Sequence, residues 1–167
     1  MIWLASLLFL IPFALIPFLG APYVPSKSRT LVPFLKKIGA KPAQTLLDLG
    51  SGDATVMLHV ARELQMNVVG VELNPFLVVF SRIRLLRFRS RSRVIYGNIW
   101  TRKIPEGTDI IYAFIMPKYM ARLEEKVTRE ISVPTIVVTY SFEFNGRKPF
   151  AQSKGFLAYN FEPLAKK

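Results

Sequence analysis

The residues best placed to do chemistry are two acidic side chains and two glycines. In the stretch TLLDLGSGDATVMLHV (45–60), Asp48, Gly50 and Gly52 come directly after a short apolar run. Glycine permits a tight turn and lets a ligand lie against bare backbone, and a helix after the turn would offer its N-terminal amides. Glu72 stands 20 residues beyond Gly52, the spacing at which a carboxylate grips ribose hydroxyls. These residues predict a site for a nucleotide-like ligand.

The composition excludes several other kinds of chemistry. The chain has no cysteine and a single histidine, His59. It therefore has no disulfide framework, no thiolate metal site, no cysteine nucleophile and no multi-histidine metal centre, and we expect no metal. The sequence also shows no nucleophile and no acid–base dyad. Their absence does not count against an enzyme, because a bound cofactor can carry the reactive group.

The elements that must position these residues alternate between strands and helices. The predicted strands are 45–49, 67–73, 93–97, 108–115, 134–144 and 155–162, and the predicted helices are 53–66, 74–90 and 117–131, with a short helix near 27–38. Apolar strands that alternate with helices indicate an α/β fold with a parallel sheet covered on both faces. The ligand of such a sheet lies at the carboxyl ends of the strands, which is where the glycine turn falls.

The sequence DLGSGDA (48–54) resembles the first motif of class I S-adenosylmethionine-dependent methyltransferases. The dinucleotide-binding fingerprint fits less well. It requires a third glycine or alanine at the position of Thr55, and it does not include an aspartate immediately before the turn. The resemblance implies a Rossmann-like class I methyltransferase sheet with helices on both faces, and S-adenosylmethionine as cofactor. It assigns the methionine end to Asp48, the underside of the cofactor to Gly50, Ser51, Gly52 and Asp53, the ribose to Glu72, and the adenine end to Asn98, Ile99 and Trp100.

Several of these positions also have a purely structural interpretation. Class I methyltransferases usually carry an aspartate for the adenine amino group where Asn98 stands. The side-chain oxygen of Asn98 can still accept from that group, or the residue can simply form a turn. Asp53 suits a helix N-cap as well as a ligand contact, and Trp100 suits either the core or an aromatic wall over the adenine. Gly50 and Gly52 could serve a turn without any ligand.

The resemblance extends to the protein-lysine methyltransferase family that includes the ATP synthase c-subunit and adenine nucleotide translocase enzymes. It rests on PYVPS (22–26), ELNPFLVVFSRIR (72–84), GNIW (97–100) and FIMPKYMARLEEKVTRE (114–130), and it implies a protein substrate with a target lysine. By analogy, Tyr23, Pro25 and Ser26 would close over the cofactor, and Phe114 to Pro117, including Met116, would line the lysine channel. At the end of a predicted strand, Tyr140 and Glu143 are candidates to orient the lysine, although a core tyrosine and a surface carboxylate are the alternatives.

The N-terminal segment is predicted to bind a membrane. Residues 1–26 carry no charged side chain, and 2–19 is apolar apart from Ser6, long enough to span most of a hydrocarbon core of about 30 Å. Because Pro12 and Pro17 would each remove a helical hydrogen bond, a bent or partly inserted anchor is an alternative. A cleaved signal peptide and a buried core helix are the others.

This segment sets the expected domain organisation and location. We expect a membrane anchor at 1–20, a linker with a short helix at 21–44 and the methyltransferase domain at 45–167. Basic residues follow the apolar segment at Lys27, Arg29, Lys36, Lys37 and Lys41. The positive-inside rule therefore places the domain on the cytoplasmic side of a membrane, or on the matrix side of the mitochondrial inner membrane in a eukaryote.

The net charge of +12 suits an acidic partner. Six arginines fall within 82–93, at spacings that would place them all round a helix rather than on one stripe. Solvated surface, anionic headgroups and nucleic acid are all compatible with them. Nucleic acid is not the expected partner, because FIMPK stands where base-modifying amino methyltransferases carry Asn/Asp-Pro-Pro-aromatic. The similar NPF follows the second strand, where Asn74 suits a helix cap. An RNA, lipid or small-molecule methyltransferase and a non-catalytic cofactor-binding membrane protein remain as alternatives.

Overall fold

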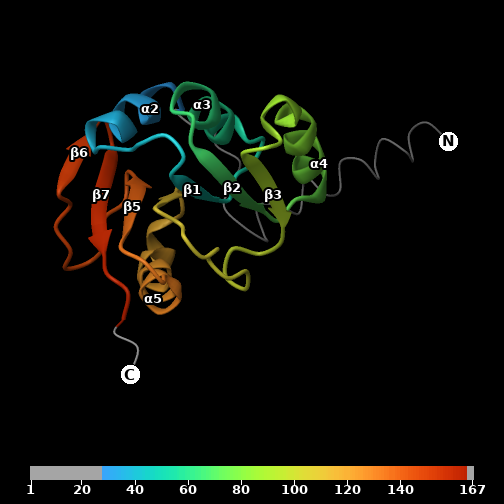
Figure 1. The fold of residues 1–167 in the computed structure, drawn as a ribbon. Helices are drawn as coiled ribbons and strands as arrows, with labels where there is room; N and C mark the ends of the chain where they lie inside the picture. Colours follow the sequence, from blue (N-terminus) through green and yellow to red (C-terminus); the bar gives the residue numbers. More distant parts are fainter. Residues whose placement is uncertain (1–27, 165–167) are drawn as a thin grey trace.

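The computed structural model of the chain describes residues 28–164, which alternate between helices and strands (Figure 1). In chain order the elements are α2 (Ser28–Lys37), β1 (Thr45–Leu49), α3 (Thr55–Glu63), β2 (Asn67–Glu72), α4 (Pro75–Arg84), the 3-10 helix η1 (Leu86–Phe88), β3 (Ser92–Tyr96), β4 (Ile110–Ala113), the 3-10 helix η2 (Pro117–Tyr119), α5 (Met120–Glu130), β5 (Thr135–Tyr140), β6 (Ala151–Ser153) and β7 (Phe156–Phe161). The predicted anchor 1–20 and the predicted cofactor residues Tyr23, Pro25 and Ser26 lie outside the described range. Within that range, no helix combines the length and the apolar character needed to cross a bilayer.

The strands form one mixed sheet in the order β3-β2-β1-β4-β5-β7-β6. Strands β1 to β5 pair in parallel, whereas β7 runs antiparallel to both β5 and β6. The prediction of a wholly parallel sheet was therefore wrong at this edge. Between β5 and β7 the chain forms the short strand β6 and no helix, whereas a parallel return would need a crossover that is usually a helix. Only two residues, Lys154 and Gly155, separate β6 from β7, and so short a connection joins only antiparallel strands. Both residues have a positive φ, as tight hairpin turns require.

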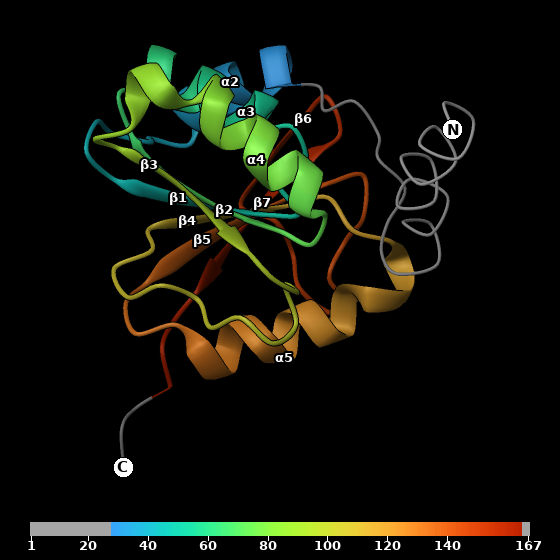
Figure 2. The same ribbon diagram turned by 90° about the vertical axis from the view of Figure 1, so that its right-hand side faces the viewer.

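Helices cover both faces of the sheet, as predicted. Figure 2 shows α2, α3 and α4 on one face and α5 on the other. The apolar residues of β1 alternate between these faces: Leu46 belongs to the core under α2 and α3, and Leu47 and Leu49 belong to the core under α5. Because side chains alternate along a strand, Asp48 lies on the same face as Leu46. Helix α2 is part of this core, and its Phe34 stacks on Phe156 of β7 at 5.6 Å between ring centroids.

Most predicted elements are present, but several are shorter than predicted. Helix α4 ends at Arg84, so the predicted helix 74–90 was too long, and only Arg82 and Arg84 of the six arginines lie on it. The predicted strand 134–144 ends at Tyr140 because Ser141 adopts a left-handed conformation with φ 67°. The predicted helix cap is confirmed: the Asn74 side chain accepts hydrogen bonds from the amides of Phe76 and Leu77.

Candidate cofactor site at the carboxyl ends of β1 and β2

The glycine turn follows β1 directly, as predicted. Gly50, Gly52 and Ala54 all have a positive φ, at 88°, 55° and 58°. The amides of Gly50 and Ser51 both donate to the carbonyl of Val71, at 2.9 and 3.1 Å, which fixes the turn against β2. A Cβ on Gly50 would meet no atom of the described residues within 4 Å. Glycine is therefore required there by the positive φ of the backbone, and no side chain of the described part of the chain fills the space beside it.

The carboxylate of Glu72 connects the turn after β1 with the loop after β2. The Glu72 side chain is buried at the end of β2. Its Oε2 accepts from the Gly52 amide at 2.8 Å, and its Oε1 accepts from the Asn74 amide at 2.8 Å. Each carboxylate oxygen has a second acceptor direction. Glu72 therefore holds both loops in place and can still accept from a ligand hydroxyl.

Asp48 is a buried carboxyl group near the end of β1. It is 2% exposed, and its Oδ2 has no hydrogen-bond partner among residues 28–164. In the sheet it stands in register with Gly70 of β2 and Tyr112 of β4. Burial, and to a lesser extent the nearby carboxylates of Glu72 and Asp53, raises the pKa of Asp48 to about 8. Such a group favours a partner that donates a hydrogen bond or carries positive charge.

Other buried polar atoms without partners lie near Asp48. Three of the four such atoms found within residues 28–164 belong to Asp48, Ser51 and Asn74. Buried polar groups are nearly always hydrogen-bonded, so a group of unpaired ones needs an explanation. A Cβ on Gly70 would lie 2.6 Å from the Ser51 hydroxyl, so the Ser51 side chain fits only because β2 has a glycine there. This edge of the sheet offers donors and acceptors that a polar ligand would satisfy.

Asp53 has partners within the protein. It accepts from the Thr55 amide at 3.0 Å and from the Thr55 hydroxyl at 2.6 Å, and it forms an ion pair with Arg84 of α4. Burial alone would raise the pKa of Asp53, but the hydrogen bonds from Thr55 and the contact with Arg84 hold it below the ordinary value. The N-cap residue of α3 is Ala54. Of the two roles that the sequence suits, the N-cap role of Asp53 is therefore displaced by one residue, although Asp53 does accept from the amide of the first helical residue, Thr55.

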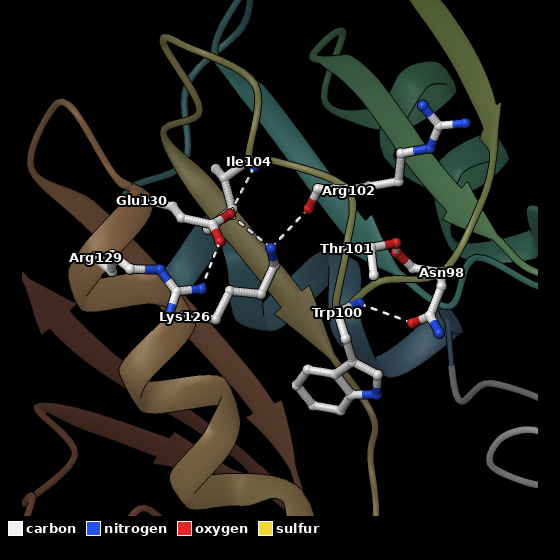
Figure 3. Close-up of polar contacts among 8 residues, drawn as sticks. All are labelled: Asn98, Trp100, Thr101, Arg102, Ile104, Lys126, Arg129 and Glu130. Carbon is white, nitrogen blue, oxygen red and sulfur yellow. Dashed lines mark hydrogen bonds and ion pairs between the residues drawn. The ribbon is translucent and has the colours of Figure 1, made fainter.

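The Asn98 side chain forms a turn after β3. Its Oδ1 accepts from the Trp100 amide at 2.9 Å (Figure 3). The Trp100 ring lies 5.5 Å from that of Tyr119, with the Arg122 guanidinium 4.6 Å from its centroid. Trp100 and the neighbouring Ile99 contact the core under α5. The structural interpretations of Asn98 and Trp100 therefore match the observed contacts.

A buried lysine fastens this loop to α5. Lys126 is 2% exposed, and its Nζ donates to the Arg102 carbonyl and to Glu130, both at 2.6 Å (Figure 3). Glu130 also accepts from the Ile104 amide at 3.2 Å. This contact was not predicted from the sequence. Lys126 lies on the apolar face of α5 between Leu123 and Val127, and a lysine on such a face is the signal that could have found it.

The predicted substrate residues meet at the ends of β4 and β5. Phe114 follows β4 directly, and its ring packs edge-on against Tyr140, the last residue of β5, at 5.2 Å between centroids. Phe142, which was not predicted, stacks on Phe114 at 6.5 Å. Met116 and Pro117 follow at the start of η2, where Pro117 is exposed and Met116 is half-buried. Tyr112 was also missed, although it stands two residues before Phe114 and thus faces the same side.

Fold and site together define a Rossmann-like cofactor-binding domain. The family described as the ANTKMT methyltransferase domain matches residues 48–151, and the chain belongs to this family. The chain is 30% identical over 125 residues to the ATP synthase c-subunit lysine N-methyltransferase of Xenopus laevis, and the match covers 74% of this chain and 54% of the relative. It is 29% identical over 135 residues to the adenine nucleotide translocase lysine N-methyltransferase of Mus musculus, with coverages of 80% and 58%. The chain thus spans just over half the length of these curated relatives.

Solved structures share the same fold. An RNA methyltransferase from Salinibacter ruber, in complex with S-adenosyl-L-homocysteine, superposes with a TM-score of 0.74 at 21% identity, and the match covers 86% of this chain and 97% of that one. Coclaurine N-methyltransferase, with N-methylheliamine and S-adenosylhomocysteine bound, matches with a TM-score of 0.57 at 21% identity, covering 70% and 39% of the two chains. At 21% identity, these similarities establish a shared fold alone.

Proposed function

We propose that this chain binds S-adenosylmethionine and transfers the methyl group to the side-chain amine of a lysine in a membrane-associated protein. The observation that carries the proposal is the set of buried polar groups at the ends of β1 and β2. Within the described part of the chain, Asp48, Ser51 and Asn74 each have an unpaired buried atom, and Glu72 stands beside them. Membership of the methyltransferase family and the names of the lysine N-methyltransferase relatives support the choice of reaction.

The residues fit this cofactor by their chemistry. The free Oδ2 of Asp48 suits the amino group at the methionine end, because carboxylates form strong hydrogen bonds with cationic donors. Glu72 suits the ribose hydroxyls, and the open side of Gly50 suits close approach to backbone. When bound, S-adenosylmethionine supplies an electrophilic methyl group on a sulfonium ion. Asn98, Ile99 and Trp100 stay candidates for the adenine end.

The remaining task of the protein is to present a neutral amine and to exclude water. We assign this task to Phe114 and Tyr140, with Met116 and Pro117 at the rim. Phe114 and Tyr140 are half-buried aromatic residues in contact with each other, and an apolar environment disfavours the charged form of an amine. The protein's own residues thus provide alignment and desolvation, and no general base is assigned.

The membrane association rests on the sequence. We propose that residues 1–20 anchor the chain and that the methyltransferase domain faces the cytoplasm, or the mitochondrial matrix in a eukaryote. The charge-free segment and the basic residues after it support this orientation. The division into 1–20, 21–44 and 45–167 stays a prediction.

The test is methyl transfer from radiolabelled S-adenosylmethionine to isolated membranes, with the label followed separately into protein, RNA and lipid. We expect label in a protein band, and mass mapping should place it on a lysine. Glu72→Gln should abolish most of the transfer, whereas Glu106→Gln, an exposed acid in the loop before β4, should leave it unchanged. Label found only in RNA or only in lipid would overturn the lysine assignment in favour of one of those substrates.

A further inference from the structure

Helix α4 is apolar on its outward side as well as on its buried side. Val78 and Ser81 of α4 face the core and are buried. On the opposite side, Val79, Phe80 and Ile83 are 56%, 53% and 62% exposed, and Leu86 of η1 continues them at 62%. Positions 79, 80 and 83 recur at helical spacing and share one side of α4, and the exposed Leu86 follows them along the chain on η1. We call these four residues the α4 stripe.

The stripe is unusual for a surface helix. The exposed residues of α5, on the other face of the sheet, include Arg122, Glu125 and Arg129, as expected for a helix that contacts water. Single exposed apolar residues are normal, but a contiguous group marks a contact surface. Helix α4 lies over β2 and β3 with its outer side turned away from the sheet (Figure 2). We therefore expect the α4 stripe to be a contact surface for another molecule or a membrane.

The charges round the stripe indicate which of these it contacts. Residues 73–105 contain eight basic side chains and no acidic one. Arg82 donates to the Val94 carbonyl and Arg84 pairs with Asp53, whereas Arg87 and Arg89 are exposed and take part in none of the ion pairs found within residues 28–164. Arg82, Leu86 and Arg89 help to line a shallow hollow beside the stripe. The stripe is thus bordered by arginines that no nearby carboxylate neutralises.

We propose that the α4 stripe docks on the anionic surface of a lipid bilayer. In this arrangement Val79, Phe80 and Ile83 enter the interface between headgroups and acyl chains, and Arg87 and Arg89 contact phosphate groups. Apolar side chains on one helix side, bordered by basic residues, are the pattern of interfacial helices. A second copy of this chain suits the surface less well, because a two-fold contact would bring the same arginines face to face. The inference rests on the surface of α4 and holds whichever substrate is methylated.

The absence of cysteine allows a direct test with the full chain. Ile83→Cys would carry one environment-sensitive fluorophore, and Glu125→Cys on α5 would be the matched control. Each protein is mixed with vesicles of phosphatidylcholine and phosphatidylglycerol, or of phosphatidylcholine alone, with quenchers on the lipid acyl chains. We expect a blue shift and quenching at position 83 with the mixed vesicles, and neither change at position 125. A label at 83 that stays in water while the protein floats with the vesicles would overturn the proposal, as would a blue shift before any lipid is added.

The role of the arginines has its own control. In the Ile83→Cys protein, the double change Arg87→Gln and Arg89→Gln should weaken the response at position 83 by about 25-fold, since each basic residue near an anionic surface contributes about fivefold. Lys36→Gln with Lys37→Gln removes the same charge from the exposed end of α2 and should have little effect on that response. An equal loss with both pairs would mean that net charge alone attracts the protein, and it would contradict a specific docking surface.

Discussion

Asp48 and Glu72 are two carboxyl groups at the ends of neighbouring strands with different surroundings. Both oxygens of Glu72 accept backbone hydrogen bonds, whereas the buried Oδ2 of Asp48 finds no partner in the part of the chain that the structure describes. The same kind of group therefore has two roles at this edge. Glu72 shapes the site before any ligand binds, and Asp48 offers an unsatisfied acceptor.

The raised pKa of Asp48 leads to a prediction about stability and pH. The folded value of about 8 exceeds the unfolded value of about 3.9, so the folded state binds more protons between these values. The free energy of unfolding should therefore fall as pH rises from about 4 to 8. Asp48→Asn cannot titrate. Its stability relative to wild type should be higher at pH 8 than at pH 5, by on the order of a few kcal/mol, as measured by urea unfolding. If the two proteins differ in stability by the same amount at pH 5 and pH 8, the raised pKa of Asp48 is contradicted.

Asp48 and Glu72 are predictable from the sequence because a strand, a glycine turn and a spaced acid form a local pattern. The role of Asn98 is not, because an amide oxygen can accept from a ligand or from its own backbone with similar ease. Asn74 was predicted as a helix cap and is one. Its buried and unpaired Nδ2 depends on neighbours distant in the sequence, which no local pattern reports.

At the scale of elements, α5 holds the loop between β3 and β4 through Lys126. Lys126→Met keeps an apolar stem of similar length but leaves Glu130 and the Arg102 carbonyl without their partner. We expect the free energy of unfolding in urea to fall by about 3 kcal/mol, as when one member of a buried ion pair is removed. Lys103→Met, at an exposed position in the same loop, should change it by less than about 0.5 kcal/mol. If the two substitutions lower the free energy of unfolding equally, the Lys126 contact does not specifically stabilise the protein.

The pH dependence provides a second check on this contact. Burial alone would raise the pKa of Glu130, but the hydrogen bonds from Lys126, Arg129 and the Ile104 amide lower it below the ordinary value. A lowered folded pKa gives stability that is present above the unfolded value of about 4.3 and is lost as pH falls through the folded value. The difference in the free energy of unfolding between wild type and Lys126→Met should therefore become smaller at acid pH.

The elements themselves were largely predictable, and their directions were less so. Helix α5 could be read from its apolar residues at helical spacing, because that spacing reports burial of one side. The apolar pattern in GFLAYNFE reports burial and does not indicate strand direction, so the antiparallel direction of β7 is not predictable from it. Strand β6 has only three residues, Ala151 to Ser153, too few to show any alternation.

At the scale of the whole molecule, the cofactor site and the α4 stripe are neighbours. Helix α4 begins directly after Asn74, whose amide binds Glu72, and the stripe starts at Val79 on the outer side of the same helix. Taken together, the two proposals put the rim of the cofactor site close to a bilayer surface. A lysine on a membrane protein would then lie within reach of the site without leaving the membrane.

The central claim is that the ends of β1 and β2 bind S-adenosylmethionine, and calorimetric titration of the full chain with this cofactor tests it most directly. Wild type should bind, and Glu72→Gln should bind about 10- to 100-fold more weakly, because hydrogen bonds to a charged group contribute about 1.5–3 kcal/mol. Glu106→Gln should bind like wild type, with circular dichroism confirming that all three proteins are folded. A folded wild type that takes up no cofactor, or a Glu72→Gln protein that binds as tightly as wild type, would contradict the account.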